Sequence, residues 1–213
     1  MTERRDEILA LAGEMFAERG FGSTTVREIA DGAGILSGSL YHHFDSKESM
    51  IDEILAGFLD GFAAKAQAVV DGGGDPADVL SRLVTLAFDA VAEDATAVAV
   101  MQNEVGFLLQ FARFAYLRKR ADEAERLWVG VIRSGIESGA FRDDLDPRLT
   151  YRFMRDAIWV TVRWYRPGGR HPIDEIRDDY LRLLLGGITV GGRRRGGPAA
   201  RPRPSAPPRR RRR

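Results

Sequence analysis

The sequence predicts an all-α protein in which a small N-terminal helix-turn-helix unit precedes a larger helical body. Three observations support this fold class. Apolar residues recur three or four positions apart through most of residues 3–190, as they do on the buried side of amphipathic helices. Asp-Pro pairs at 75–76 and 146–147 combine a helix cap with proline at the first helical position. No segment alternates apolar and polar residues as a half-buried strand does.

The first two helices are defined by their ends. A helix is expected over about residues 3–19, and Gly20 ends it because glycine accepts the left-handed conformation found beyond a helix C-terminus. Thr25 and Glu28 have the spacing of a capping box, in which each side chain accepts a hydrogen bond from the other residue's backbone N–H. A second helix should therefore start directly after Thr25, with an apolar side made of Val26, Ile29 and Ala30.

A third, short helix follows a tight turn. Gly32 and Gly34 supply the turn of three or four residues that a helix-turn-helix requires. Ser37 is expected to cap this helix, and Leu40 and Phe44 lie four apart on its buried side. The outer side is small and polar at its N-terminal end, which lets a backbone press into a major groove; it consists of Ser37, Gly38, Ser39 and His42.

The body is expected to hold a series of longer helices. Ser46 caps a helix over about residues 47–70, long enough to leave the N-terminal unit, and three glycines break the chain after it. The remaining helices are expected near residues 76–92, 95–103, 104–118, 120–138, 147–165 and 172–185. We accordingly divide the chain into a helix-turn-helix domain (1–46), a helical domain (47–190) and an Arg/Pro/Gly-rich tail (191–213).

The composition excludes several classes of site. The 213 residues include no cysteine and three histidines, so disulfides, thiolate nucleophiles and cysteine-ligated zinc are excluded and a histidine metal site is not expected. No run of 18 apolar residues could span a membrane, and the N-terminus has no apolar stretch like that of a signal peptide. We therefore expect a cytoplasmic protein without metal, cofactor or membrane association.

The charge is distributed unevenly along the chain. The net charge is +1, but residues 193–213 contain ten arginines and no acid, so residues 1–192 carry −9. Overall charge therefore does not indicate a nucleic-acid-binding protein. Residues 191–213 lack the apolar side chains that offset the entropy of ordering, so disorder is expected there. This tail is either a basic arm that attracts DNA through its phosphates or a weakly constrained extension.

One long ordered pattern crosses the N-terminal helices. It consists of residues 16–21, Thr24-Thr25-Val26-Arg27-Glu28-Ile29-Ala30, Ala33-Gly34, Gly38-Ser39-Leu40-Tyr41-His42-His43-Phe44 and Ser46-Lys47-Glu48. With this pattern, about residues 8–60 resemble the TetR family of bacterial transcriptional repressors. The resemblance implies a homodimer that binds double-stranded operator DNA. It also implies a small-molecule pocket in the second domain and a four-helix dimer interface built from residues 147–165 and 172–185 of each subunit.

The resemblance also implies which residues contact DNA. Ser37, Gly38 and Ser39 match base-reading positions, with Leu36 as an apolar contact to a thymine methyl group. A serine hydroxyl both donates and accepts and so discriminates weakly between bases, which leaves DNA shape, water and two subunits to supply specificity. Phosphate contacts are implied for Tyr41, His43, Lys47, Thr24, Thr25 and Arg27, and His42 lies on the outer side. The alternative interpretations are packing for Tyr41, exposure to solvent for Lys47, His42 and His43, and pairing with nearby acids for Arg27.

An arginine- and tryptophan-rich segment near residue 160 is the candidate effector site. Arg155, Trp159 and Arg163 lie four apart and so share one helical face. Because the helix around them is largely apolar, we expect it to be buried, and a buried arginine needs a partner. That partner is either an acid, Asp156 or one across a dimer interface, or a bound anion. The predicted effector-binding residues are Arg155, Trp159, Arg163, Trp164 and Arg166.

Within the TetR family, residues 29–44 and Trp164-Tyr165-Arg166-Pro167-Gly168-Gly169 are similar to repressors of bacterial cholesterol and steroid-ring catabolism. This resemblance implies release from DNA by a CoA thioester of a bicyclic steroid remnant. A repressor that responds to another anionic apolar effector, such as a fatty acyl-CoA, is the alternative, and clustered arginines argue against a cationic drug. An enzyme is not expected, because the chain has neither a cysteine nor the Gly-x-Ser-x-Gly elbow of a serine hydrolase.

Overall fold

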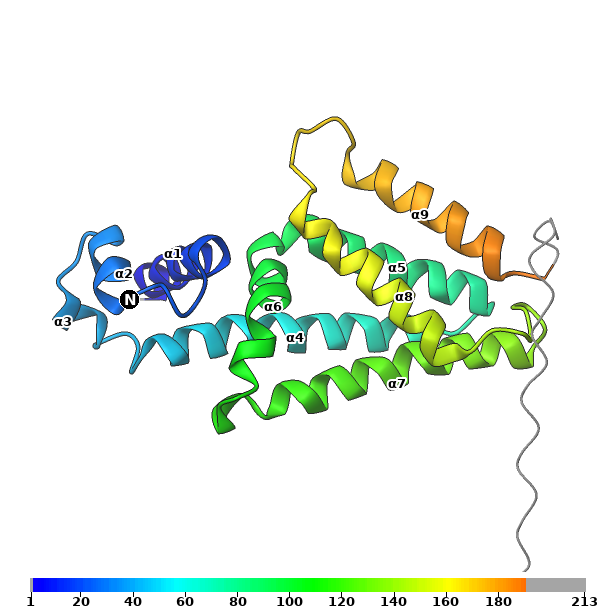
Figure 1. The fold of residues 1–213 in the computed structure, drawn as a ribbon, viewed down its shortest axis with the longest axis horizontal. Helices are drawn as coiled ribbons and strands as arrows, with labels where there is room; N and C mark the ends of the chain where they lie inside the picture. The colour runs from blue at the N-terminus through cyan, green and yellow to red at the C-terminus, as the bar shows by residue number, and fades with distance from the viewer. Residues whose placement is uncertain (1, 191–213) are drawn as a thin grey trace, which may run out of the picture.

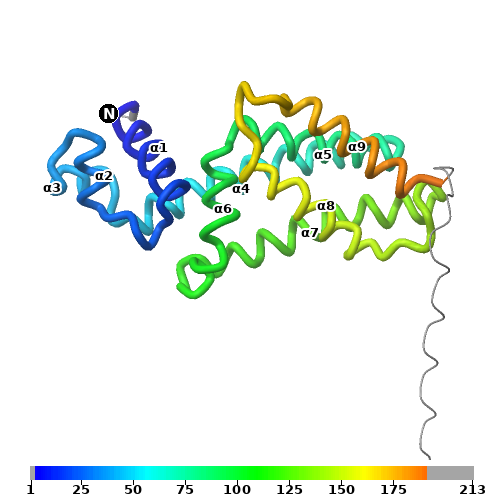
Figure 2. Tube along the Cα trace, turned by 45° about the horizontal axis from the view of Figure 1, so that its top comes forward, coloured from blue at the N-terminus to red at the C-terminus, as the bar shows by residue number. Residues whose placement is uncertain are grey.

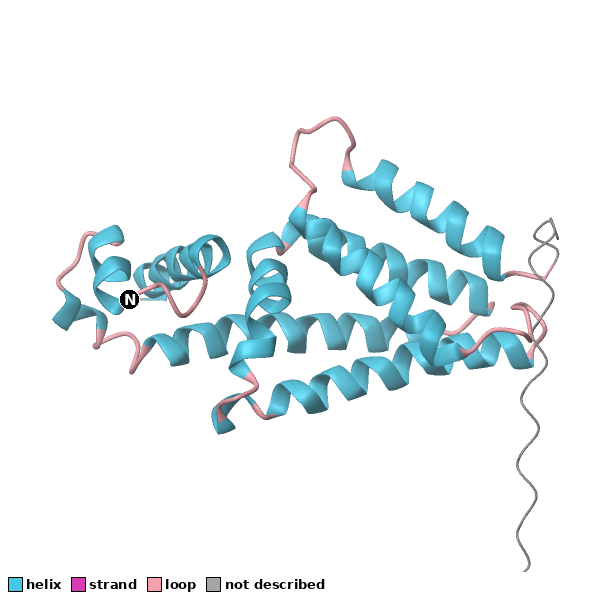
Figure 3. Ribbon diagram, in the orientation of Figure 1, coloured by secondary structure: helices cyan, strands magenta, loops and turns pink. Residues whose placement is uncertain are grey.

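The computed structural model describes residues 2–190, which form helices joined by loops (Figure 3), with one isolated β-bridge between Phe141 and Thr189. This confirms the predicted all-α fold class. The helices are α1 (Thr2–Arg19), α2 (Val26–Gly32), α3 (Ser37–Leu40), α4 (Lys47–Asp71), α5 (Pro76–Glu93), α6 (Ala95–Leu108), the 3₁₀ turn η1 (Ala112–Phe114), α7 (Tyr116–Glu137), α8 (Pro147–Val160), the 3₁₀ turn η2 (Thr161–Arg163) and α9 (Ile173–Ile188). The expectations for residues 191–213 lie outside the described residues.

The molecule is elongated, with the helix-turn-helix unit at one end. Figure 1 shows α1, α2 and α3 grouped there, while α4 runs from this group along the body beside α7. Helix α6 lies across α4 and contacts α1, and α9 packs on α5 (Figure 2). Helix α4 therefore reaches from the third helix of the helix-turn-helix into the centre of the body.

The helix starts predicted from the caps Thr25, Asp75 and Asp146 are confirmed. The Thr25 hydroxyl accepts from Glu28 N, and Glu28 Oε2 accepts from Thr25 N at 2.8 Å, which completes the capping box at the start of α2. Asp75 and Asp146 cap α5 and α8, each with a side-chain oxygen 2.8 Å from a backbone N–H and proline at the next position. Gly20 adopts φ +87° after α1, a conformation that side chains rarely tolerate.

Two predicted boundaries in the body are wrong. The helices expected near 95–103 and 104–118 are instead one helix, α6, followed by a reversal through η1. The reversal contains neither glycine nor proline; it places Phe114 in the core with 1% of its surface exposed, so tertiary packing sets the turn. The helix expected over 147–165 ends at Val160 and continues as the 3₁₀ turn η2.

Two clusters of buried side chains hold the structure together. The first combines α1–α4 with residues from the body, including Val100, Leu108, Phe114 and Leu117. The second fills the body between α4, α5, α7, α8 and α9. Because the first cluster crosses the predicted domain limit at residue 46, the helix-turn-helix unit packs directly against α6 and the start of α7. The domain limits themselves stay a prediction.

Candidate DNA-binding surface and effector cavity

The third helix of the helix-turn-helix is a single turn anchored by its apolar side. Leu40 and Phe44 are buried, as predicted, in the first core cluster. The expectation that Ser37 caps this helix is wrong: Leu36 is the N-cap, makes no side-chain cap bond, and Ser37 is the first helical residue. The serine side chain is therefore not committed to capping α3.

The outer side of α3 is open to solvent. Leu36 is 80% exposed and Tyr41 is 55% exposed. Gly38 and His42 are exposed, while Ser37, Ser39 and His43 are half-buried. A side chain added at Gly38 would meet no protein atom within 4 Å. The structure thus brings the residues predicted on this surface together on one accessible side of α3 and the turn that follows it.

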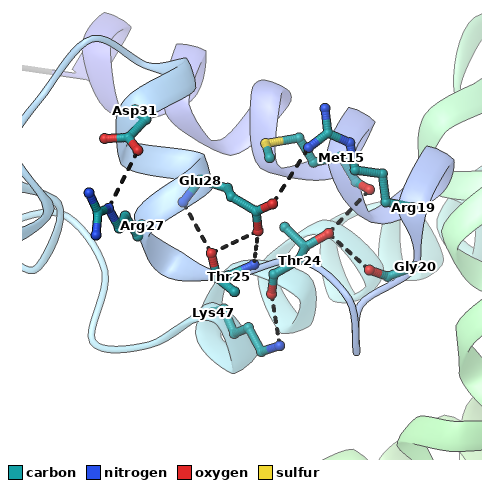
Figure 4. Close-up of polar contacts among 9 residues, drawn as sticks. All are labelled: Met15, Arg19, Gly20, Thr24, Thr25, Arg27, Glu28, Asp31 and Lys47. Atoms are coloured by element: carbon teal, nitrogen blue, oxygen red, sulfur yellow. Dashed lines mark hydrogen bonds and ion pairs between the residues drawn. The ribbon is translucent and has the colours of Figure 1, made fainter.

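Thr24 is the residue whose predicted DNA contact disagrees with the structure. Its side chain is completely buried, and its hydroxyl donates to Gly20 O at 2.9 Å, with Met15 O also near at 3.4 Å (Figure 4). A hydroxyl enclosed in this way cannot reach a phosphate without unfolding the turn between α1 and α2. Thr24 fixes that turn instead.

The Lys47 side chain is also hydrogen-bonded to the protein's own backbone. Its ammonium donates to Phe21 O at 2.8 Å and to Thr24 O at 2.9 Å, and it lies 4.4 Å from the centroid of the Phe21 ring. Two of its three donor hydrogens are thereby committed. Lys47 joins the start of α4 to the turn that precedes α2, as Figure 4 shows for the Thr24 contact.

Thr25 and Arg27 remain at the surface of α2. The Thr25 hydroxyl donates to Glu28 Oε2 at 2.7 Å, and these hydrogen bonds lower the pKa of Glu28. The Arg27 side chain is 85% exposed and has one loose ion pair, 3.7 Å from Asp31 (Figure 4). An ion pair between two exposed side chains stabilises little, so Arg27 is available to a phosphate.

Arg5 is a residue of this unit that the sequence reasoning missed. From α1 it forms two hydrogen bonds of 2.6 and 2.7 Å to the Glu53 carboxylate on α4. Its guanidinium also lies 4.4 Å from the Phe44 ring centroid, and its Nε donates to His43 O at 3.4 Å. Arg5 therefore ties the end of the α3 turn to α4. No local motif marks such a contact, because its partners lie 38 to 48 residues away.

The body contains a cavity of about 350 Å³ bounded by α4, α5, α6, α7 and α8. Its aromatic wall is continuous: the Trp159 ring lies 5.3 Å from Phe62 and 6.2 Å from Phe58, centroid to centroid. Trp128 and Ile158 extend this apolar wall. The charged residues of the lining are Arg120, Asp122, Glu125 and Arg155. The cavity is thus apolar with charges of both signs at its edges.

Arg155 lines this cavity but is not buried as predicted. Its side chain is 42% exposed, and its Nη2 lies 2.7 Å from Asp156, the structural partner considered from the sequence. Met154 and Ile158 occupy the buried side of α8 instead. Trp159 is half-buried and lines the cavity as expected. The arginine therefore has both an ion-pair partner and access to the cavity.

The remaining predicted effector residues lie elsewhere. Arg163, Trp164 and Arg166 are absent from the cavity lining, and all three are exposed, Trp164 by 53%. The cause is the end of α8 at Val160, after which the four-residue spacing no longer keeps Arg163 on the same face as Arg155. Arg166 donates to the carbonyl oxygens of Arg163 and Tyr165. In one subunit these three residues belong to the surface.

The body has a second hollow that the sequence did not predict. It occupies about 670 Å³ between α4 and α7 and shares Leu59, Phe62, Arg120, Ala124 and Trp128 with the cavity. Its residues form no sequence motif because they come from two helices that meet only in the fold. Among residues 2–190, no cluster of metal-ligand side chains occurs, and no helix is long and apolar enough to cross a bilayer.

Comparisons with known proteins match both the helix-turn-helix unit and the helical body. A family described as "Bacterial regulatory proteins, tetR family" matches residues 8–54, and one described as "Tetracyclin repressor-like, C-terminal domain" matches residues 73–188. The transcriptional repressor KstR2 of Rhodococcus jostii is 51% identical over 185 residues, covering 87% of this chain and 91% of that protein. KstR2 of Mycobacterium tuberculosis is 50% identical over 192 residues, covering 90% and 96%.

A solved structure of a relative has the same fold. The ketosteroid transcriptional regulator KstR2 of Mycobacterium tuberculosis superimposes with a TM-score of 0.85 at 50% identity, covering 88% of this chain and 95% of that one. These relatives are transcriptional repressors, so the helix-turn-helix at the N-terminus is a DNA-binding unit and the chain is not an enzyme. Since both parts match and the identity extends over nearly the whole described chain, this protein belongs to the TetR family of bacterial transcriptional repressors.

Proposed function

We propose that this protein represses genes of steroid-ring degradation and leaves its operator when a CoA thioester derived from a steroid enters the cavity of the body. The single observation that carries the proposal is the cavity itself, with its aromatic wall and with Arg155 at its edge. The relatives named ketosteroid regulators support the steroid class. Cytoplasmic residence, expected from the sequence, belongs to this proposal.

The operator is read from the outer side of α3. Leu36, Ser37, Gly38 and Ser39 face the base edges, while Tyr41, His42 and His43 lie beside the groove. Thr25 and Arg27 at the start of α2 reach the phosphates, which position the protein without reading sequence. Thr24 and Lys47 act on DNA binding indirectly, by holding the turn from which α2 starts.

The size and chemistry of the cavity select the effector. A volume of about 350 Å³ lies at the lower end of the range for ligand pockets, so it accepts a compact fused-ring acyl group rather than a whole coenzyme. Flat aromatic walls from Phe58, Phe62 and Trp159 suit such rings better than a flexible chain. Guanidinium groups of Arg155 and Arg120 at the edge suit phosphate or carboxylate. The alternative effector is a fatty acyl-CoA of similar charge.

The active form is a homodimer. Helix α8, the segment after it and α9 carry large apolar side chains exposed in the single subunit: Leu149, Phe153, Val160, Trp164 and Leu183. Exposed apolar side chains in such number mark an interaction surface. Two subunits related by a two-fold axis would present two α3 helices to successive turns of a duplex, about 34 Å apart.

The test is an operator-release titration. The purified protein is bound to its operator fragment, and a CoA thioester of a bicyclic steroid-ring acid, a long-chain acyl-CoA and free CoA are added in parallel. We expect the steroid thioester to dissociate the complex at the lowest concentration. Retention of the complex at saturating thioester would reject this effector, and stronger release by the long-chain acyl-CoA would favour the alternative.

The Arg155→Ala variant tests the site. Its guanidinium lines the cavity, so we expect at least about a tenfold weaker response to the thioester, since a charged hydrogen bond contributes about 1.5–3 kcal/mol, while operator affinity stays unchanged. The Arg166→Ala variant, which removes an exposed arginine outside the cavity lining, is the matched control. Loss of operator binding in the Arg155 variant would instead indicate a structural ion pair with Asp156.

A further inference from the structure

The cavity and the DNA-binding unit meet along a seam between α4 and the segment that begins α7. We use "seam" for the contacts of Asp52 and Asp60 on α4 with Arg113, Tyr116 and Arg120. Two ion pairs cross it: Arg113 Nε lies 3.0 Å from Asp52 Oδ2, and Arg120 pairs with Asp60. Figure 1 shows α7 beginning beside the first half of α4. Any shift of α7 along or away from α4 must change these contacts.

Two polar atoms on the seam are buried and unsatisfied. Asp52 Oδ1 and the Tyr116 hydroxyl are both shielded from solvent, and neither makes a hydrogen bond of ordinary length and angle among the described residues. Burial, and next the interaction of the hydroxyl with the Asp52 carboxylate, raise the pKa of Tyr116, so the hydroxyl is a donor that already faces this acceptor. Unpaired buried donors and acceptors are unfavourable. A small closure of the seam that joins the two groups is therefore favoured.

Asp52 and Tyr116 both lie close to the cavity and to the core of the helix-turn-helix unit. On α4, Ile51 is packed in the core cluster of the DNA-binding helices, whereas Phe58 lines the cavity. Asp52 and Phe58 are six positions apart, which corresponds to about 9 Å of helix. On α7, Leu117 directly follows Tyr116 and lines the cavity. The seam thus lies between the effector site and the core that supports α3.

We propose that a hydrogen bond from Tyr116 to Asp52 is the contact that holds α4, and with it α3, in the DNA-binding position. The proposal rests on the cavity being the effector site. An occupant lodged between Phe58 and Leu117 keeps α7 away from α4, so the pair stays apart; contraction of the unoccupied cavity brings α7 toward α4 and closes the seam. The effector then opposes the operator because it has a higher affinity for the open seam.

The Tyr116→Phe variant removes the donor and nothing else. Operator affinity should fall and effector affinity should rise, each by up to about fivefold, because the loss of one net hydrogen bond shifts the balance between the two states. Operator binding is measured by fluorescence anisotropy of a labelled duplex. Effector binding is measured with the CoA thioester of a bicyclic steroid-ring acid by quenching of the cavity tryptophans, Trp128 and Trp159.

Two further variants test whether the effect belongs to this contact. Tyr180→Phe removes the hydroxyl of a half-buried tyrosine on α9, packed 5.4 Å from Phe88 and away from α4, and should change neither affinity. Asp52→Ala removes the acceptor and should shift both affinities in the same directions as Tyr116→Phe. It also removes the ion pair with Arg113, so the comparison is made in its background: once Asp52 is replaced, adding Tyr116→Phe should change either affinity little, because its partner is already absent.

The remaining outcomes are decisive. A parallel loss of both affinities in Tyr116→Phe, the reverse pattern, or no change in either would overturn the proposal. If the wild-type protein binds no thioester, the proposed effector is rejected. Operator affinity alone then tests the seam contact, and Tyr116→Phe must bind operator more weakly than Tyr180→Phe does. If the wild type responds to the thioester and Tyr116→Phe matches it in both affinities, the seam contact fails while the proposed function stands.

Discussion

Gly38 is a residue that the protein itself does not require to be glycine. A Cβ at this position would meet no atom within 4 Å, and the residue does not adopt positive φ. Glycine in a helix is less favourable than alanine by about 0.5–1 kcal/mol. Any advantage of glycine at this position therefore lies outside the folded chain, on the exposed side of α3 where DNA would approach.

This reasoning predicts opposite effects on stability and function. Gly38→Leu should leave the free energy of unfolding unchanged or raise it, because leucine is a good helix former with open space here. Operator affinity should fall by about five- to a hundredfold, corresponding to about 1–3 kcal/mol for a disrupted base contact. Denaturant unfolding and anisotropy titration measure the two quantities. Gly57→Leu, a second exposed helical glycine with open space, is the control that should keep operator affinity.

At the scale of elements, the hairpin between α7 and α8 depends on a direct contact between a ring and a backbone. The Phe141 ring lies on α7 at Gly135, where a Cβ would come within 2.1 Å of the ring. Phe141 is 1% exposed, and its N–H donates to Gly135 O at 2.8 Å. This contact fixes the angle at which the chain leaves α7 for α8, and so the position of the cavity wall.

Gly135→Ala should therefore destabilise the protein even though alanine favours helices. The added methyl group must displace a fully buried ring, and overpacking of this kind costs about 1–3 kcal/mol. Gly130→Ala, in the same helix but with no atom within 4 Å of the added Cβ, should instead be neutral or stabilising. Equilibrium unfolding in urea compares the two; equal stabilities would show that Phe141 relaxes without cost.

The elements that could be predicted from sequence are those with local signals. The capping box of α2 and the Asp-Pro starts of α5 and α8 each depend on residues within four positions of one another. The reversal at η1 and the early end of α8 could not be predicted, because the burial of Phe114 and the packing around Thr161 are tertiary. The same distinction applies to the sites. The outer side of α3 followed from local periodicity, whereas the cavity needed five helices.

At the scale of the whole molecule, the two core clusters explain how one ligand could act on a distant surface. The first cluster includes side chains from α1 to α4 together with Leu108, Phe114 and Leu117. The second cluster includes Trp128, Tyr151 and Ile158, which line the cavity. Helix α4 contributes to both, with Ile51 in the first and Ala66 in the second. Continuous packing along α4 therefore gives the proposed effector site a physical connection to the helix-turn-helix.

The assembly of two subunits should depend on the apolar residues exposed on α8 and α9. Phe153 is 69% exposed and Leu183 is 79% exposed in the single chain, so replacing both by glutamate adds charge without disturbing the core of a subunit. We expect this variant to sediment as a monomer and to lose most of its operator affinity, because each subunit then binds a half-site without the contacts of its partner.

The control is Phe111→Glu, which places one glutamate at another exposed phenylalanine, between α6 and α7, and should remain dimeric. Analytical ultracentrifugation measures the mass, and circular dichroism checks that helix content is kept. A Phe153→Glu/Leu183→Glu variant that stays dimeric would place the interface on another surface. In that case the two α3 helices would have to be brought to one duplex by helices other than α8 and α9, and the apolar residues on α8 and α9 would need another partner.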